Sequence, residues 1–123
     1  MSTNNPDGLV AFMVQQREVY RHELPQRLAK IESLWEIFRR SEEPREGLNA
    51  IERCAHNLAG SSATFGFSEI GDAARDLELL LSESPHDFEA SFISVQSKIS
   101  LAIEALRRAL VDAGVTPNIQ AIP

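Results

Sequence analysis

The sequence has little of what cross-linking, nucleic-acid binding or membrane insertion requires. Among its 123 residues there is one cysteine, so no disulfide bond can form within the chain. Twelve lysines and arginines against eighteen acidic residues give a net charge of -6, without the clustered positive charge that DNA, RNA or an anionic membrane attracts. No apolar run approaches the roughly 18 residues of a membrane span, and no glycine-rich phosphate loop is present.

What the chain does contain indicates one cytoplasmic domain. Apolar residues make up 43% of the sequence, which is enough for a single compact core. Residues 1–6 are expected to be a flexible N-terminus. This polar start lacks the basic and apolar regions of a signal peptide. Residues 7–114 are expected to form the domain, and residues 115–123 a loose tail. A lone thiol suits a reducing cytoplasm, and we expect a monomer.

The apolar residues recur at the three- and four-residue steps of an α-helix, and no window alternates for long as a strand would. The first such segment, over residues 7–13, is short and is expected to cap one end of the domain. A second helix is predicted over residues 20–38, with a kink or a restart near Pro25. Residues 41–47 read as a loop.

Three further helices are indicated. Apolar steps over residues 48–65 stop at Gly66, and Ser68 is expected to be the N-cap of the next helix. Residues 84–87 are expected to open the last helix, which ends at Gly114. Because each helix has one apolar stripe and short connections, the prediction is an all-α, up-down four-helix bundle with one or two accessory N-terminal helical segments.

One histidine lies on the solvent side of the helix predicted over residues 48–65. At about 100° per residue, His56 points away from that helix's core stripe. Its neighbours on the helix surface are Glu52, Arg53, Ala59, Gly60 and Ala63. The surface that follows His56 is therefore almost bare backbone, although a glycine inside a helix costs about 1 kcal/mol relative to alanine. Small residues leave room for a partner to approach the ring, whose neutral form offers a nucleophilic nitrogen.

The same residues have a plainer interpretation. A single histidine on a solvated helix face is usually an ordinary surface residue, and Gly60 would equally fit a close crossing of two helices. Metal and cysteine chemistry fit poorly, because Glu52 and His56 do not form the repeated Glu-x-x-His pairs of di-iron bundles. Cys54 and His56 diverge on a helix and do not face each other. We therefore expect no metal site and no bound cofactor.

The segment around His56 also carries a longer motif. It consists of the string HNLAGSS over residues 56–62, the turn Phe65-Gly66-Phe67, and then Ile70, Ala74, Leu77 and Glu78. This motif resembles that of the histidine-containing phosphotransfer (HPt) domains of two-component phosphorelays. The Leu24-Pro25 stretch before a helix also looks like the family, so the resemblance extends over nearly the whole chain.

The resemblance implies a phosphorelay intermediate. His56 would accept a phosphoryl group from a receiver-domain aspartate or a kinase and pass it to another receiver aspartate, without ATP-dependent kinase activity of its own. The partners would be receiver domains of response regulators or hybrid histidine kinases, which supply their own aspartate and Mg²⁺. The surface that admits the partner would comprise Gly60, Ala59, Arg53, Ala63 and Asn57.

The sequence departs from the family's pattern at one position. Many members carry lysine or arginine three residues after the histidine, where a positive charge can neutralise the phosphoryl group, and this chain has Ala59 there. Arg53 lies one turn earlier and is only a partial substitute. Two alternatives remain open. One is an adaptor bundle that binds receivers without carrying phosphate, and the other is a receiver phosphatase, for which Glu52 and Asn57 are nearby but on different faces.

Overall fold

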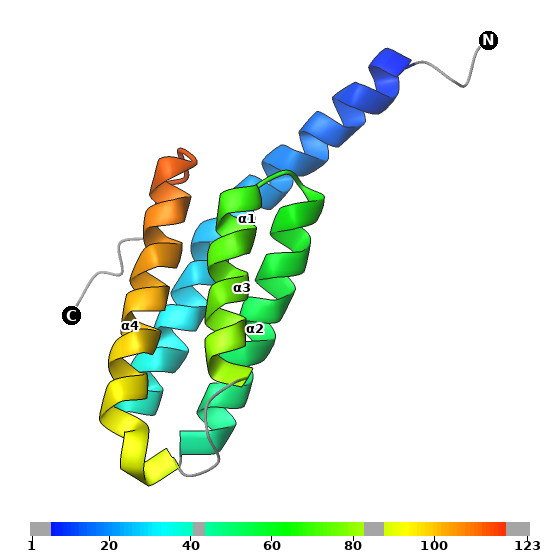
Figure 1. Cartoon of the computed structure of the whole chain (residues 1–123). Coiled ribbons are helices and arrows are strands. Elements are labelled where there is room, and N and C mark those ends of the chain that lie inside the picture. Colours follow the sequence, from blue (N-terminus) through cyan, green and yellow to red (C-terminus); the bar gives the residue numbers. More distant parts are fainter. Residues whose placement is uncertain (1–5, 41–43, 83–87, 118–123) are drawn as a thin grey trace.

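The computed structural model describes residues 6–40, 44–82 and 88–117. In these ranges the chain forms α1 (Pro6–Arg40), α2 (Pro44–Thr64), α3 (Ser68–Ser82) and α4 (Phe88–Asp112), with no strand. Successive helices run in opposite directions and pack on each other, and α4 also contacts α1, which closes the bundle (Figure 1). The predicted all-α four-helix bundle is confirmed. Within the described ranges, none of the helices has a stretch long and apolar enough to cross a lipid bilayer.

The core is built from the apolar stripes that the helical spacing predicts. On α2 the buried residues are Leu48, which is 8% exposed, and Ile51, Ala55, Leu58 and Ser62, each at most 1% exposed. The largest fully buried apolar side chains of the other helices are Leu24, Leu28, Ile31, Ile70, Leu77, Ile99, Leu106 and Leu110. Burying one such side chain stabilises the fold by about 1.5–3 kcal/mol. Because the stripe of α2 faces inward, the opposite face of this helix is left to solvent.

Helix α1 is continuous, which corrects one expectation and excludes one of the two alternatives in another. The short segment over residues 7–13 is not a separate helix that caps the bundle, and no restart occurs at Pro25, which lies inside α1. No helix-breaking residue separates Met13 from Tyr20, so the gap in the apolar pattern there does not interrupt the helix. Leu24 and Leu28, both fully buried, hold the turns on either side of Pro25 against the core.

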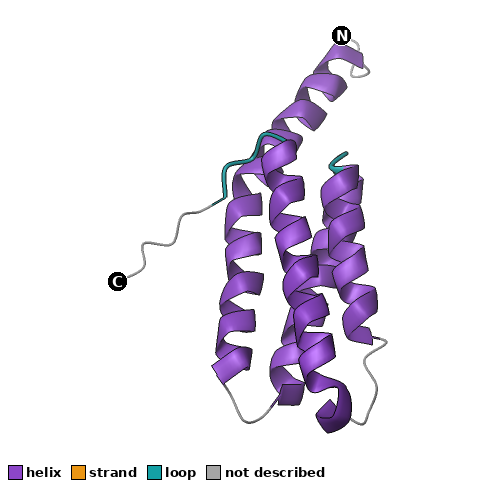
Figure 2. Cartoon of the chain, turned by 60° about the vertical axis from the view of Figure 1, so that its left-hand side comes forward, coloured by secondary structure: helices purple, strands orange, loops and turns teal. Residues whose placement is uncertain are grey.

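The N-terminal part of α1 projects past the end of the bundle and leans away from its axis (Figures 1 and 2). Leu9, Phe12 and Met13 are 62%, 56% and 60% exposed. They are apolar at helical spacing, which is why the sequence predicts a packed helix here. Within the described residues they pack against no other helix, since the bundle ends near Tyr20.

The turn between α2 and α3 differs from the prediction in one detail. Gly66 has a φ of +82°, and the Phe67 amide donates to the Ser62 carbonyl at 2.8 Å, so α2 ends in a Schellman motif as its glycine predicts. The Phe67 carbonyl accepts from the Gly71 amide at 2.9 Å, which makes Phe67 the N-cap of α3. Ser68 is therefore the first helical residue and not the cap.

The remaining boundaries shift slightly. Helix α2 begins at Pro44, inside the loop predicted over residues 41–47, because proline is favourable in the first turn of a helix. The predicted start of α4 at residues 84–87 lies outside the described residues. Helix α4 ends at a glycine as expected, Gly114, with a φ of +78°. Val115, which the sequence predicts to belong to the loose tail, is only 4% exposed and packs in the core.

A chain of hydroxyl groups joins α1 to α2. Tyr20 Oη lies 2.7 Å from Ser61 Oγ and 2.9 Å from Ser62 Oγ, and Ser61 Oγ donates to the Asn57 carbonyl at 2.7 Å. Because each hydroxyl has one hydrogen, Ser62 donates to Tyr20 and Tyr20 donates to Ser61. The Tyr20 ring stacks on Phe65 with 4.7 Å between centroids. This chain fixes the last turns of α2 against α1.

Removing the Tyr20 hydroxyl should destabilise the bundle. In Tyr20→Phe the buried Ser62 Oγ loses its tyrosine partner, and we expect a loss of about 1–3 kcal/mol in the free energy of unfolding. Adding Ser62→Ala should recover part of that loss, because the unsatisfied hydroxyl is then gone. Urea unfolding of both single variants and the double variant measures the coupling. Strictly additive losses would contradict the hydrogen-bonded chain.

Candidate functional site

The exposed face of α2 that carries His56 borders α3, and the two helices pack antiparallel. Ser82 Oγ lies 2.9 Å from Glu52 Oε1 and also 2.9 Å from the Glu78 carbonyl oxygen, so its single hydrogen is shared between the two acceptors. One turn further along α2, His56 Nδ1 lies 2.7 Å from Glu78 Oε1. Beyond these contacts Gly71 brings the backbones together, since a Cβ built there would lie 3.2 Å from a carbonyl oxygen of α2. Helix α3 therefore supplies side chains to the same surface as His56.

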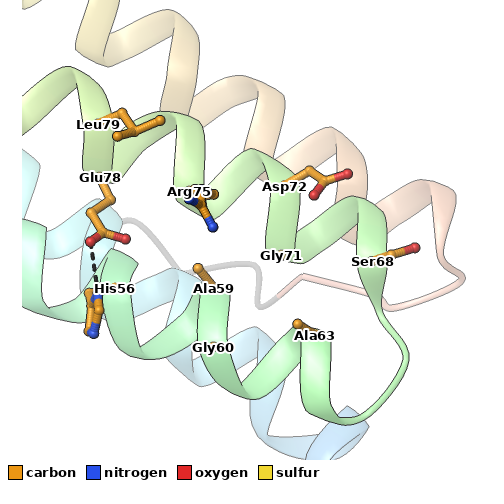
Figure 3. A pocket seen from close by; sticks show the side chains of 10 residues that line it. All are labelled: His56, Ala59, Gly60, Ala63, Ser68, Gly71, Asp72, Arg75, Glu78 and Leu79. Atoms are coloured by element: carbon orange, nitrogen blue, oxygen red, sulfur yellow. Dashed lines mark hydrogen bonds and ion pairs between the residues drawn. The ribbon is translucent and has the colours of Figure 1, made fainter.

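The His56 ring stands on the surface with one nitrogen held. Its side chain is 71% exposed, whereas that of Glu78 is 24% exposed. A carboxylate only accepts hydrogen bonds, so the neutral ring carries its hydrogen on Nδ1 and keeps a free lone pair on Nε2. Figure 3 shows the Nδ1 edge turned toward α3 and the other ring nitrogen turned away from it. Glu78 thus selects which nitrogen is available.

An open hollow of about 370 Å³ lies beside His56, between α2 and α3 (Figure 3). It is lined from α2 by His56, Ala59, Gly60 and Ala63, and from α3 by Ser68, Gly71, Asp72, Arg75, Glu78 and Leu79. A Cβ placed on Gly60 would meet nothing within 4 Å. The bare surface that the sequence predicts after His56 is therefore a real opening and not a helix crossing.

Arg53 and Asn57 lie on the other flank of His56. They line a second, smaller hollow of about 240 Å³ together with Glu52, His56 and Glu78. Both side chains are exposed. The structure thus places every residue that the sequence analysis selected around one imidazole ring, on two sides of it.

Sequence reasoning gave no role to the side chains that α3 contributes. Glu78 belongs to the motif, but its distance of 22 residues from His56 says nothing about a direct contact. Arg75 and Asp72 were not selected at all. The only signal for them is their helical spacing before Glu78, and it becomes informative only once the register of α2 against α3 is known.

The other two histidines and the cysteine of the chain lie away from the larger hollow or outside the described residues. His22 is exposed on α1, and His86 lies outside the described residues. Cys54 is a free thiol, half-buried against the core, and does not line either hollow. Among the residues that the structure describes, no three histidine, cysteine, aspartate or glutamate side chains gather as metal ligands would.

Comparison with known protein families matches residues 15–110 to the Hpt domain. The chain belongs to the Hpt domain family. Hpt domains are phosphocarriers of two-component phosphorelays, and they contact receiver domains. The matched range of this Hpt domain covers all of α2 and α3, and so both hollows beside His56. Searches of curated proteins and of solved structures found no significant match.

Two glycines of this Hpt domain should respond oppositely to alanine. Gly60→Ala should leave stability unchanged or raise it by up to about 1 kcal/mol, because the added methyl meets open space. Gly71→Ala should destabilise the domain, since its methyl would lie 3.2 Å from the Ala59 carbonyl oxygen, a backbone atom. Thermal unfolding followed by circular dichroism compares the two. A stabilising Gly71→Ala would show that α3 shifts easily on α2.

Proposed function

We propose that His56 is the phospho-accepting residue of this Hpt domain, and that it carries a phosphoryl group between receiver aspartates. The observation that carries the proposal is the 2.7 Å contact of Nδ1 with Glu78, on a ring that is otherwise 71% exposed. It leaves Nε2 as an accessible nucleophile beside a surface cleared of side chains. An ordinary surface histidine needs neither a fixed ring nor a bare neighbouring turn.

The proposed reaction balances on a few groups. The Nε2 lone pair attacks the phosphorus of the receiver's aspartyl phosphate, an N–P bond forms, and the P–O bond to the aspartate breaks. The aspartate leaves as a carboxylate, and the ring becomes positively charged while Nδ1 keeps its hydrogen. The Glu78 carboxylate then faces an imidazolium, which it stabilises more than the neutral ring. The reverse steps return the phosphoryl group to an aspartate, so one geometry serves both directions of flow.

The partner supplies the rest of the chemistry in this proposal. A receiver domain of a response regulator or hybrid histidine kinase brings the aspartate and the Mg²⁺ ion, and the bundle positions the imidazole in line with them. The site comes from α2 and α3 of one chain, which supports function as a monomer. The free thiol of Cys54 supports a cytoplasmic location.

The geometry favours the carrier over the receiver phosphatase. A phosphatase has to present a free acidic or amide side chain to its partner. Glu78 is bonded to His56, and Glu52 lies within hydrogen-bond distance of Ser82 Oγ. Asn57 is exposed but lies on the flank away from the larger hollow. An adaptor that carries no phosphate would need no fixed imidazole.

Replacing His56 should abolish phosphoryl transfer without unfolding the bundle. His56→Gln, incubated with a receiver domain labelled on its aspartate, should take up no label, while His22→Gln should accept it as the wild type does. The wild-type label should be lost in acid and survive base, as expected for phosphohistidine. Label that persists in a folded His56→Gln variant would refute the assignment.

Filling the bare surface should block the partner. Gly60→Gln puts a long side chain into open space, so the domain should stay folded with an unchanged circular dichroism spectrum. Label transfer from the receiver should fall by at least about tenfold, because a receiver aspartate can no longer come into line with Nε2. Gly60→Ala is the matched control and should retain most of the rate. Normal transfer in Gly60→Gln would mean that the partner approaches from the Arg53 side.

A further inference from the structure

A phosphoryl group on His56 brings about 1.5–2 negative charges to this surface. Nothing on α2 beyond the histidine answers that charge, because the next turn offers only Ala59, Gly60 and Ala63. The α3 residue in contact with the ring, Glu78, is a carboxylate and cannot neutralise the phosphoryl charge. On the side of the larger hollow, α2 therefore supplies no cation to neutralise this charge, and the Arg53 side chain of α2 lies on the other flank of the ring.

The register of the helix pair identifies an answering group on α3. Glu52 contacts Ser82, and His56 contacts Glu78. Because the two helices are antiparallel, moving four residues toward the C-terminus of α2 corresponds to moving four residues toward the N-terminus of α3. Three further steps in the same register place Arg75 opposite Ala59. The close packing of Gly71 keeps the two helices in this register past Ala59, since a Cβ built on Gly71 would lie only 3.2 Å from the Ala59 carbonyl oxygen.

The space around Arg75 is open. Figure 3 shows its side chain coming from α3 toward Ala59, whose methyl group leaves the hollow clear. Arg75 is exposed, and within the described part of the chain no carboxylate forms an ion pair with it. Asp72 and Glu78 line the same hollow, but Glu78 is bonded to His56 and Asp72 lies one turn further from the ring.

Building on the proposed role of His56, we infer that Arg75 is the phosphoryl-binding cation of the site. In this proposal the long Arg75 side chain extends past the small Ala59 methyl group to meet the oxygens of a phosphoryl group on Nε2, although that nitrogen itself is turned away from α3. Arg53 is the weaker candidate, since it leaves from the same helix as His56 and the two side chains run parallel.

This placement has a consequence for the lifetime of the phosphorylated state. Hydrolysis of the N–P bond passes through a loose, metaphosphate-like transition state in which the phosphoryl oxygens carry less negative charge than in the ground state. A cation beside them stabilises the ground state more than the transition state, and so slows hydrolysis. Loss of Arg75 should therefore shorten the lifetime of the phosphohistidine.

The test follows the decay of phosphorylated protein with no receiver present. Wild type and variants are loaded with phosphoramidate, a small phosphoryl donor, and the phosphohistidine signal is followed by phosphorus NMR. Arg75→Gln should decay about two- to fivefold faster than wild type at low salt, the range expected of an exposed charge contact. The difference should shrink at high salt, because exposed charges are then screened. A purely structural role for Arg75 would not depend on salt in this way.

Three further variants make the result decisive. Arg108→Gln removes the same charge from an exposed position on α4 and should decay like wild type. Ala59→Lys in the Arg75→Gln background should restore the lifetime, because an ammonium then occupies the opposite side of the same contact. Equal decay of Arg75→Gln and wild type would overturn the inference, as would faster decay confined to Arg53→Gln. If wild-type His56 takes up no phosphoryl group at all, it is the proposed function that fails.

Discussion

The candidate site depends on one close contact between two helices. Gly71 lets the backbone of α3 approach the Ala59 carbonyl more closely than a side chain there would allow. That approach sets the register in which Glu78 meets His56 at 2.7 Å. Without it, the imidazole would stand on α2 with no carboxylate to select its tautomer. The chemistry attributed to one histidine is in this sense a property of the α2–α3 pair.

The two glycines of the site illustrate how different one residue type can be in the same fold. Gly71 is buried and serves packing, whereas Gly60 is exposed, faces a hollow and meets nothing. Sequence spacing alone left both possibilities open for Gly60, and the structure assigns the helix crossing to Gly71. Helix pairing and partner access are thus handled by different residues, so each can change without the other.

The sequence predicted what lies on a single helix much better than what lies between helices. The stripe of α2 and the exposure of His56 follow from the 3.6-residue period, and Gly66 ends that helix as its conformational freedom suggests. Glu78 and Arg75 were not assigned roles, because a period within one helix carries no information about the register of the next. The sequence left a kink and a restart at Pro25 as alternatives for a related reason, and the restart does not occur because the packing of distant residues outweighs a local helix-breaking tendency.

Because α1 extends past the end of the bundle, the two parts of this helix differ in stability. From Tyr20 onward its turns open only if the core opens, because their apolar side chains are buried among α2 and α4. Arg17 still contacts the bundle, because its Nε donates to the Phe65 carbonyl at 3.0 Å and its guanidinium lies over the Phe67 ring. The segment before Arg17 is an exposed helix of about 16 Å, and isolated helices of that length are marginal in water. Its backbone hydrogen bonds therefore break and re-form locally, while those a few turns later share the global stability of the domain. The turn from Arg17, bonded to the Phe65 carbonyl, to Tyr20, stacked on the Phe65 ring, marks the boundary between fraying and cooperative unfolding along a continuous run of hydrogen bonds.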